Sequence, residues 1–333
     1  MSGKPNQTPH LYDKDISIDF YEERYAHGYM EEAWPSEKKQ RILGVLRSLE
    51  LPEQGEALDF GCGNGALTEI LRHALPPNWK VFGTDISSVA LQKAKQRFPA
   101  CTFFAIGDAG FAGRRFDLVF THHVLEHVYD LDQVLLEILA HLKSASAMLH
   151  ILPCGNPGSF EHQVCLLHKD GIDAELENRF FFEDEGHVRR LTTEQLNERC
   201  AKEGFALAQA AYSNQHFGAL NWITRSGRNF IRTFTDTSQA VDAKAKRRLQ
   251  LLRCQLWGIW VLRYPAALVE NRLRKRSRTA RDYVCLGCAL LLYPFAKPMD
   301  LYLKSKAFEE WRTRKTDPCG SEMYLFFKRE SRG

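Results

Sequence analysis

Apolar and polar residues alternate along the first half of this chain with two different periods. Short apolar runs typical of buried strands occur at 57–60, 79–85, 101–106, 116–121 and 147–153. Between or before them lie segments whose apolar residues recur at helical spacing, at 36–49, 65–75, 89–98 and 131–142. Strands that alternate with helices in this way predict an α/β fold with a parallel sheet and helices on both faces.

Two more strands are predicted at 205–213 and 322–329. A helix precedes the first of them: Thr192 and Gln195 form a capping box at its start, and Gly204 ends it. The long segment between the two strands is basic, helical in pattern and rich in Trp and Tyr. We therefore expect a seven-stranded sheet with a helical insertion before the last strand. The expected division is a core at 1–214, a basic helical insertion at 215–319, and a final core strand and tail at 320–333.

The composition fits a folded, globular chain, because 44% of its 333 residues are hydrophobic and 26% are charged. The nine cysteines form no short disulfide framework, and the N-terminal residues contain no apolar signal segment. A reducing, cytoplasmic location is the expectation. Cys285 and Cys288 have the C-x-x-C spacing but lie in an apolar run, so we expect them to pack as small hydrophobic side chains.

A glycine-rich loop follows the first predicted strand, where residues 59–65 read DFGCGNG. Glycines at this place let backbone N–H groups and the start of the next helix approach a ligand closely. Gly61, Gly63 and Ala66 also satisfy the dinucleotide pattern G-x-G-x-x-G/A. The loop alone therefore does not separate two classes of cofactor.

The charge of the residues around this loop distinguishes a dinucleotide from the other class of cofactor. Asp59 would repel the pyrophosphate of a dinucleotide, whereas S-adenosylmethionine (SAM) has no phosphate and carries a cationic sulfonium and ammonium. Asp85 ends the second strand, where a carboxylate can accept hydrogen bonds from both ribose hydroxyls. Asp108 follows the third strand and is placed to reach an adenine amine. Together these three carboxylates favour SAM.

The order of these motifs resembles that of the class I SAM-dependent methyltransferases. The acidic-x-Gly-x-Gly-x-Gly loop, the acidic end of strand two, the Gly-Asp-Ala after strand three and FDLVFTHHVLEHV at 116–128 all occur in the family's order. The resemblance covers about 1–214 and 320–330, and it implies a Rossmann-like sheet, mostly parallel, with an antiparallel last strand and SAM as the cofactor. The expected cofactor-binding residues are Asp59, Gly61, Gly63, Gly65, Asp85, Ile86, Asp108 and Ala109.

The acceptor is expected beyond the carboxyl ends of strands four and five, where open α/β sheets bind their ligands. If the residues after strand four form a helical turn, His123, Glu126 and His127 share one face. These three candidate catalytic residues could supply a general base for a hydroxyl acceptor, or bind a divalent metal that lowers the pKa of the acceptor. A third interpretation is that they only pack and hydrogen-bond beneath the cofactor.

This segment is similar to the Glu-x-x-Glu-His metal motif of ubiquinone-pathway O-methyltransferases and small-RNA 2′-O-methyltransferases. His123 stands where that motif has its first Glu, a departure that favours a base over a metal. In the metal alternative His162, after strand five, would be a further ligand beside His123, Glu126 and His127. His187 precedes the capped helix, in a loop that often closes over the acceptor in related enzymes, and a solvated loop is the alternative there.

The insertion is strongly basic. Residues 225–315 contain 21 Lys and Arg against 7 Asp and Glu, a formal charge of +14, whereas the rest of the chain carries −10. Trp257 and Trp260 lie in an apolar pattern, followed by a basic cluster at 272–278 and an apolar run at 283–293 that is too short to span a bilayer. This composition fits a helical lid, an interfacial helix on anionic lipid, or an RNA clamp.

These observations predict a SAM-dependent methyltransferase that acts on a small-molecule or lipid-like acceptor, with O-methylation as the expected reaction. One alternative is an RNA methyltransferase that uses the insertion as a clamp, and another is a SAM-binding protein without catalysis. Peripheral contact with the anionic inner face of a membrane is expected ahead of nucleic-acid binding. The acceptor, the methylated atom and the oligomeric state stay open.

Overall fold

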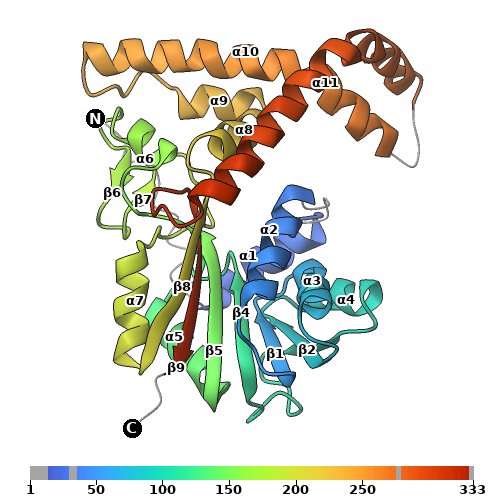
Figure 1. The fold of residues 1–333 in the computed structure, drawn as a ribbon, viewed down its shortest axis with the longest axis vertical. Helices are drawn as coiled ribbons and strands as arrows, with labels where there is room; N and C mark the ends of the chain where they lie inside the picture. The colour runs from blue at the N-terminus through green and yellow to red at the C-terminus, as the bar shows by residue number, and fades with distance from the viewer. Residues whose placement is uncertain (1–13, 30–35, 275–278, 330–333) are drawn as a thin grey trace. The chain divides into compact units, whose positions relative to one another are not determined.

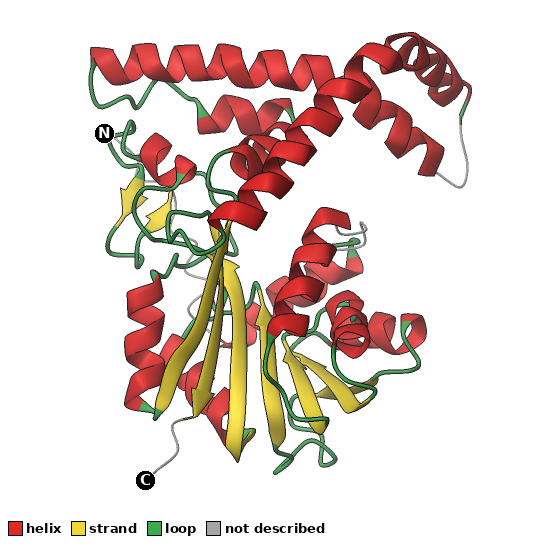
Figure 2. Cartoon of the chain, viewed as in Figure 1, coloured by secondary structure: helices red, strands yellow, loops and turns green. Residues whose placement is uncertain are grey.

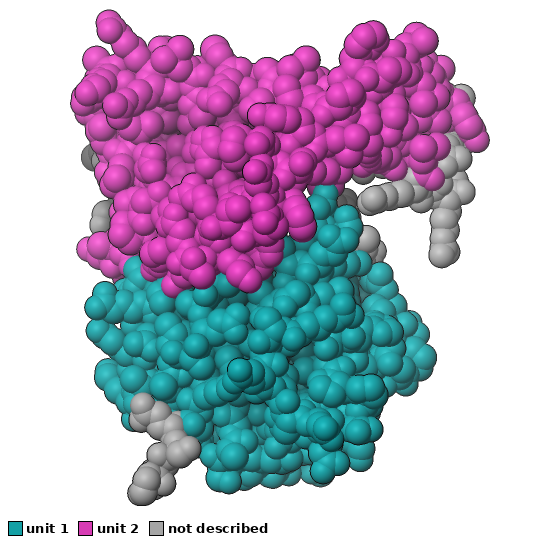
Figure 3. Space-filling model, viewed as in Figure 1, with its two compact units in different colours: residues 1–154, 184–211, 323–333 teal, residues 155–183, 212–322 magenta. Residues whose placement is uncertain are grey.

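The computed structural model describes residues 14–29, 36–274 and 279–329, and it divides into two compact units (Figure 3). Unit 1 comprises residues 1–154, 184–211 and 323–333, and unit 2 comprises residues 155–183 and 212–322. Residues 155–183, which the sequence analysis assigned to the core, therefore group with the insertion. Val164 explains this grouping, because its side chain is buried in the hydrophobic cluster of unit 2.

A seven-stranded sheet organises the fold (Figure 1 and Figure 2). Its strand order is β3-β2-β1-β4-β5-β9-β8, in which β1 to β5 pair in parallel and β9 is antiparallel. This arrangement confirms the predicted Rossmann-like methyltransferase sheet. The strands are β1 (Gln54–Phe60), β2 (Asn78–Asp85), β3 (Thr102–Ala105), β4 (Phe116–His122), β5 (Leu142–Pro153), β8 (Phe205–Ser213) and β9 (Glu322–Arg329).

The central strands are buried along most of their length. Every residue of β4 except Asp117 is buried, and β5 is buried from Ser146 to its end. Near-continuous burial of this kind is typical of parallel strands that are covered on both faces. The largest difference from the predicted boundaries is in β5: Leu142 begins this strand, because α5 (Leu131–Ala140) ends two residues earlier than its apolar spacing indicated.

Side chains cap several helices of unit 1. Ser87 accepts a hydrogen bond from the N–H of Ala90 at the start of α4, and Thr192 and Gln195 form the predicted capping box of α7. α1 has no counterpart in the sequence analysis. The remaining bounds are α1 (Lys14–Ala26), α2 (Ser36–Ser48), α3 (Ala66–Ala74), α4 (Ser88–Arg97) and α7 (Thr193–Lys202).

Unit 2 consists mainly of helices, as predicted for the insertion. Its bounds are α6 (Phe160–Cys165), β6 (Ile172–Asp173), β7 (Arg179–Phe180), α8 (Phe217–Arg225), α9 (Arg228–Phe234), α10 (Ala243–Arg274) and α11 (Ala280–Arg314). Ile223 of α8, Phe234 of α9 and Leu256 of α10 are fully buried in one hydrophobic cluster. This cluster gives unit 2 a core of its own.

Trp257 and Trp260 take part in this internal packing. Both are partly buried against the cluster, and their ring centroids lie 5.5 Å apart. The ring of Tyr264 lies 4.9 Å from that of Trp260. Of the three alternatives for the insertion, the interfacial helix would use these tryptophans at a lipid surface, whereas both side chains pack partly within unit 2.

α11 is much longer than the apolar run that the sequence indicated. Residues 283–293 lie within one continuous helix, and Pro294 and Pro298 stand inside it without ending it. From Asp282 to Arg314 the helix is long and apolar enough to cross a membrane by length and composition, with a mean hydropathy of 1.3 in an 18-residue window of which 17% is buried. The apolar run 283–293 is therefore one part of a longer helix.

Candidate cofactor and acceptor site

Unit 1 contains a cavity of about 240 Å³ at the carboxyl ends of β1 and β4. β1 has β2 on one side and β4 on the other, so the order of the strands reverses at this point. Open α/β sheets bind their ligands at such a switch point. Gly61, Gly63, Asp85 and Ile86 line the cavity as predicted for the cofactor, and so do His123 and His127 of the predicted acceptor side.

The glycine loop approaches its neighbours too closely for side chains. Gly61 and Gly63 have φ values of +75° and +52°, which disfavour other residues. A Cβ atom on Gly61 would lie 2.4 Å from a methyl of Val124, and one on Gly63 would lie 2.5 Å from the hydroxyl of Tyr25. Gly65 precedes α3 without a side-chain cap, so the first turn of this helix can receive a ligand.

Asp85 is the carboxylate that faces the cavity. One of its oxygens accepts a hydrogen bond from the N–H of Gly63 (2.7 Å), and the other accepts one from the N–H of Ser87 (2.9 Å). Burial raises the pKa of Asp85 to about 6. Because each carboxylate oxygen can accept two hydrogen bonds, Asp85 can hold the loop and still accept hydroxyl donors from a ligand.

Asp59 does not line the cavity. Its carboxylate accepts a hydrogen bond from the hydroxyl of Thr68 in α3 (2.6 Å) and is fully buried. Burial raises the pKa of Asp59 to about 7. The structure thus places Asp59 beneath the loop, where it joins β1 to α3, and any effect on a cationic ligand would act across the loop backbone.

An Asp59→Asn substitution should therefore change the pH dependence of folding. The pKa of this carboxyl is raised from 3.8 to about 7, so its contribution to the free energy of unfolding is lost as the pH rises through that window. Asparagine does not ionise, so the variant should gain up to about 1.4 kcal/mol per pH unit relative to the wild type between pH 4 and pH 7. Urea unfolding at several pH values measures the difference; a difference independent of pH would show that Asp59 titrates normally.

Asp108 and Ala109 are exposed and lie off the cavity wall. The carboxylate of Asp108 accepts a hydrogen bond from the N–H of Ala105 (2.8 Å) and so closes the turn after β3. Ile106 of the same turn lines the cavity instead. The predicted contact between Asp108 and an adenine amine stays a prediction.

α1 supplies one wall of the cavity, which the sequence analysis did not foresee. Tyr21, Tyr25 and Tyr29 recur every four residues, as does Ser17, and all four side chains face the cavity. Glu22 fixes this helix, because its carboxylate accepts hydrogen bonds from the backbone of Ser88 and Val89 at the start of α4 and from the hydroxyl of Ser87. The spacing of the three tyrosines by four residues is the sequence signal that could have revealed this wall of the cavity.

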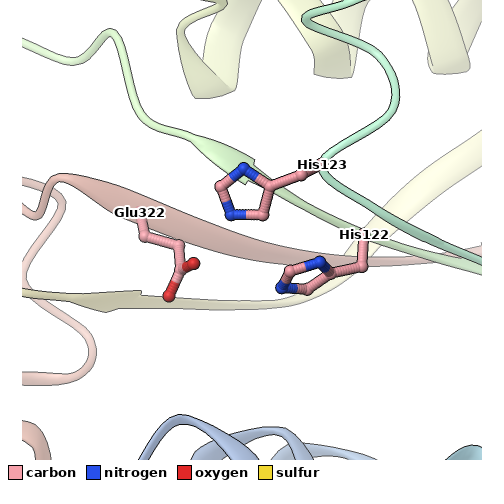
Figure 4. Close-up of side chains that lie close together, drawn as sticks. All are labelled: His122, His123 and Glu322. Atoms are coloured by element: carbon pink, nitrogen blue, oxygen red, sulfur yellow. The ribbon is translucent and has the colours of Figure 1, made fainter. Parts of the chain in front are cut away.

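Two adjacent histidines line the cavity: His122, the last residue of β4, and His123, which follows it. Figure 4 shows the side chains of His122 and His123, whose ring centroids lie 4.4 Å apart. Glu322, also drawn there, is the first residue of β9 and belongs to unit 2, where its carboxylate accepts a hydrogen bond from the hydroxyl of Ser213 (3.1 Å). His123 has a φ of +53°, a left-handed conformation that is uncommon outside glycine.

The segment after His123 is a turn and not the helical turn that the sequence analysis assumed. The N–H of His127 bonds to the carbonyl of Val124 (2.9 Å), and no helix is assigned here. Glu126 is nevertheless close to both predicted partners: its carboxylate lies 2.7 Å from Nδ1 of His123 and 3.9 Å from Nε2 of His127. Nε2 of His123 lies 3.1 Å from the ammonium of Lys38. Both ring nitrogens of His123 are therefore engaged.

Burial and neighbouring charges keep Glu126 ionised and His127 neutral. Burial alone would raise the pKa of Glu126, but the neighbouring His123, His127 and His187 outweigh it and hold that pKa at about 2. Burial and the charge of His187 lower the pKa of His127 to about 4. His127 donates from Nδ1 to the carbonyl of Gly186 (2.8 Å), so its Nε2 carries the lone pair. A neutral imidazole thus stands beside an ionised carboxylate.

The loop that carries His187 is tied to the turn and to α1. Arg24 of α1 forms a two-point ion pair with Asp184 (2.8 and 3.1 Å), and Asp184 accepts a hydrogen bond from the N–H of Gly186. The N–H of Val188 bonds to the carbonyl of Glu126 (2.9 Å). The rings of His127 and His187 consequently meet edge to face at 4.5 Å, and His187 lines the cavity.

The structure changes the set of residues that could hold a metal. Among the described residues, ligand atoms of Glu126, His127 and His187 lie within 4.8 Å of one another. His162 belongs to unit 2, on α6, where its ring packs against Phe180. His187 is thus a possible ligand beside the predicted Glu126 and His127, and metal binding by His123 or His162 stays a prediction.

Comparison with known proteins gives matches to one kind of domain. A family model described as "Methyltransferase domain" matches residues 25–210. Trans-aconitate 2-methyltransferase of Variovorax paradoxus is 30% identical over 122 residues, which cover 36% of this chain and 47% of that protein. 2-Phytyl-1,4-naphtoquinone methyltransferase of Thermosynechococcus vestitus is 34% identical over 96 residues, covering 27% of this chain and 42% of that one. The chain thus spans about half the length of the curated relatives it matches.

Solved structures give matches of lower identity. Magnesium protoporphyrin IX methyltransferase from Synechocystis PCC 6803, with bound S-adenosylhomocysteine (SAH), is 18% identical, and the match covers 60% of this chain and 93% of that one with a TM-score of 0.43. The plantazolicin methyltransferase BpumL, in complex with a substrate analogue and SAH, is 12% identical, with 97% and 95% covered and a TM-score of 0.44.

Proposed function

Because this chain belongs to the methyltransferase-domain family, we propose that it transfers the methyl group of SAM to an oxygen atom of a small-molecule or lipid-like acceptor. The observation that carries the proposal is that one cavity joins both halves of the predicted site. Gly61, Gly63 and Asp85 line it on the cofactor side, and His127 and His187 line it on the acceptor side. Methyl donor and acceptor can therefore meet without solvent between them.

His127 is the proposed general base. As the acceptor oxygen attacks the methyl carbon, the carbon–sulfur bond breaks, SAH leaves, and the acceptor's proton passes to Nε2 of His127. The hydrogen bond from Nδ1 to Gly186 fixes the tautomer that this step needs. The three neighbouring histidines hold the pKa of Glu126 at about 2 although it is buried, so its carboxylate is ionised and would stabilise the imidazolium that forms.

Two buried hydroxyls support a polar acceptor. Ser17 Oγ and Tyr21 Oη line the cavity, and neither has a hydrogen-bond partner among the described residues. Buried polar atoms normally pair, so these two hydroxyls are suited to hydrogen-bonding a ligand. Two of the relatives are named for small acceptors, trans-aconitate and 2-phytyl-1,4-naphtoquinone, which supports a small molecule here as well.

A metal is the competing account of the same side chains. A carboxylate and two imidazoles are donors that divalent zinc accepts, and Glu126, His127 and His187 would hold it. When bound, the metal would lower the pKa of the acceptor hydroxyl. We favour the base because the carboxylate of Glu126 already lies against Nδ1 of His123.

The proposal is tested by incubating a cell extract with the protein and methyl-labelled SAM, after dialysis of both against EDTA. We expect the label to enter a small molecule, identified by mass spectrometry, without added metal. Activity that requires Mg²⁺ or Zn²⁺ would favour the metal account over the general base. Label in RNA would favour the alternative in which the insertion is an RNA clamp. Label that stays in SAM with every extract would leave a SAM-binding protein without catalysis.

A further inference from the structure

The first half of α11 presents a continuous apolar face to solvent. Its side chains are strongly exposed: Phe295 by 80%, Leu291 by 78% and Val284 by 68%. With the exposed Cys288 they recur at intervals of four, three and four residues, the spacing of one helix face. We call these four residues the α11 face. Exposed apolar patches of this kind mark binding surfaces for proteins or membranes.

Other residues of α11, outside the α11 face, are buried or paired with α10. Ala289, Ala296 and Leu303, spaced by seven residues, are buried. Two ion pairs link the two helices, Arg263 of α10 with Asp300 of α11 (2.6 Å) and Glu270 of α10 with Lys297 of α11. These buried residues and ion pairs do not involve the four residues of the α11 face.

The sequence that precedes this face suits an anionic partner. Residues 272–281 contain six Lys or Arg and no Asp or Glu, and one of the six, Arg272, pairs with Asp282. Residues 275–278 lie outside the described part of the chain and are not counted in the face. Tyr283 and Tyr302, both exposed, flank it on α11. An apolar helix face with tyrosines at its edges and a basic segment before it in the sequence has the composition of elements that lie on anionic bilayers.

The uncharged part of α11 is suited to lying in a bilayer surface and not to crossing it. Residues 283–296 contain no charged side chain. As a helix these residues extend about 21 Å, less than the hydrocarbon core of about 30 Å. Lys297 and Asp300 follow directly and are paired with α10. We propose that the α11 face binds the surface of an anionic lipid bilayer, a property that goes beyond the proposed methyl transfer and does not depend on it.

The test is sedimentation of the purified protein with vesicles of phosphatidylcholine and phosphatidylglycerol (3:1). The wild type should sediment at low salt, and a Leu291→Asp/Phe295→Asp variant should bind at least about tenfold more weakly. The matched control is Leu251→Asp/Phe308→Asp, which changes two apolar side chains of unit 2 outside the face that are also strongly exposed, by 72% and 62%. High salt should weaken wild-type binding without abolishing it, because burial of apolar side chains is not screened.

Depth is measured with an environment-sensitive dye on a single exposed cysteine. Cys285 and Cys319 are replaced by serine, together with Cys254 or Cys288, so that either Cys288 on the face or Cys254 on α10 carries the dye. Vesicles should shift the emission to the blue at Cys288 and leave it unchanged at Cys254. Sedimentation equilibrium without lipid tests the other occupant, a second copy of the chain.

Three results would overturn the proposal. The wild type could stay in the supernatant with the anionic vesicles, or the control variant could lose as much binding as the face variant. Alternatively, the wild type could form a dimer that Leu291→Asp/Phe295→Asp dissolves, with no blue shift at Cys288 on addition of vesicles; the face would then be an interface between copies. Unchanged far-ultraviolet circular dichroism and thermal unfolding in both variants show that each is folded.

Discussion

Methyl transfer by the His127→Ala variant should fall by about 10²- to 10⁴-fold, the range expected when a general base is removed. SAM affinity should stay within a few-fold of the wild type, because His127 lies in the part of the cavity assigned to the acceptor. Single-turnover transfer from labelled SAM measures the rate, and calorimetry measures the affinity. His141→Ala is the matched control, since His141 is also partly buried but packs on Phe111 away from the cavity.

Glu126→Gln should show a related loss. The substitution keeps the shape of the side chain and removes the charge that lies 2.7 Å from His123 and 3.9 Å from His127. The imidazolium of the transition state then lacks its counter-ion. If both variants transfer the methyl group at the wild-type rate, the turn after β4 is structural and the base is elsewhere.

The pH profile of the wild type should reflect the perturbed histidine. Burial and the charge of His187 lower the pKa of His127 to about 4, so the imidazole is neutral and able to accept a proton well below its ordinary value of 6.5. The acidic limb of kcat/KM assigned to this residue should therefore lie near pH 4 and be absent in His127→Ala. A limb near 6.5 would mean that His127 is solvated in the working enzyme.

Asp85→Ala should weaken SAM binding by about 1.5–3 kcal/mol, a loss of roughly 10- to 150-fold in Kd. The carboxylate lines the cavity, and its loss also removes the acceptor that holds the N–H of Gly63. Asp108→Ala is the matched control, because Asp108 is exposed and bonds to its own turn. Equal losses in the two variants would show that Asp108 reaches the cofactor, as the sequence analysis predicted.

Asp85 should also make SAM binding depend on pH. Burial raises its pKa to about 6, so the ionised form that accepts ligand hydroxyls is lost as the pH falls through that value. Calorimetry of the wild type from pH 8 to pH 5 should show the affinity declining. The same titration of Asp85→Asn should show a weak affinity that changes little with pH.

The parallel sheet was predictable because burial on both faces leaves continuous apolar strands, and because Gly61 and Gly63 mark the turn after β1. The orientation of Asp59 was not predictable, since one position in a buried strand does not reveal whether the carboxylate meets the ligand or the hydroxyl of Thr68. The charge of Asp59 suggested that it meets the ligand. In the structure its carboxylate instead accepts a hydrogen bond from the hydroxyl of Thr68 beneath the loop.

The residues of the predicted acceptor side lie close together, but not in the predicted geometry. Spacing put His123, Glu126 and His127 on one helical face, whereas His123 adopts a left-handed conformation and the chain makes a turn. Two further residues that contact this turn, Lys38 and His187, come from distant parts of the sequence. His187 had a signal in its loop before the capped helix, whereas the contact of Lys38 with His123 depends on the tertiary fold and has no local pattern.

The central claim is that the cavity of unit 1 is built for SAM and not for a dinucleotide. The most direct measurement is calorimetric titration of the purified chain with SAM, SAH and NADH. The arrangement of the glycine loop and Asp85 predicts binding of SAM and SAH with one site per chain and no heat from NADH. Tight binding of NADH, with no binding of SAM or SAH, would contradict the account.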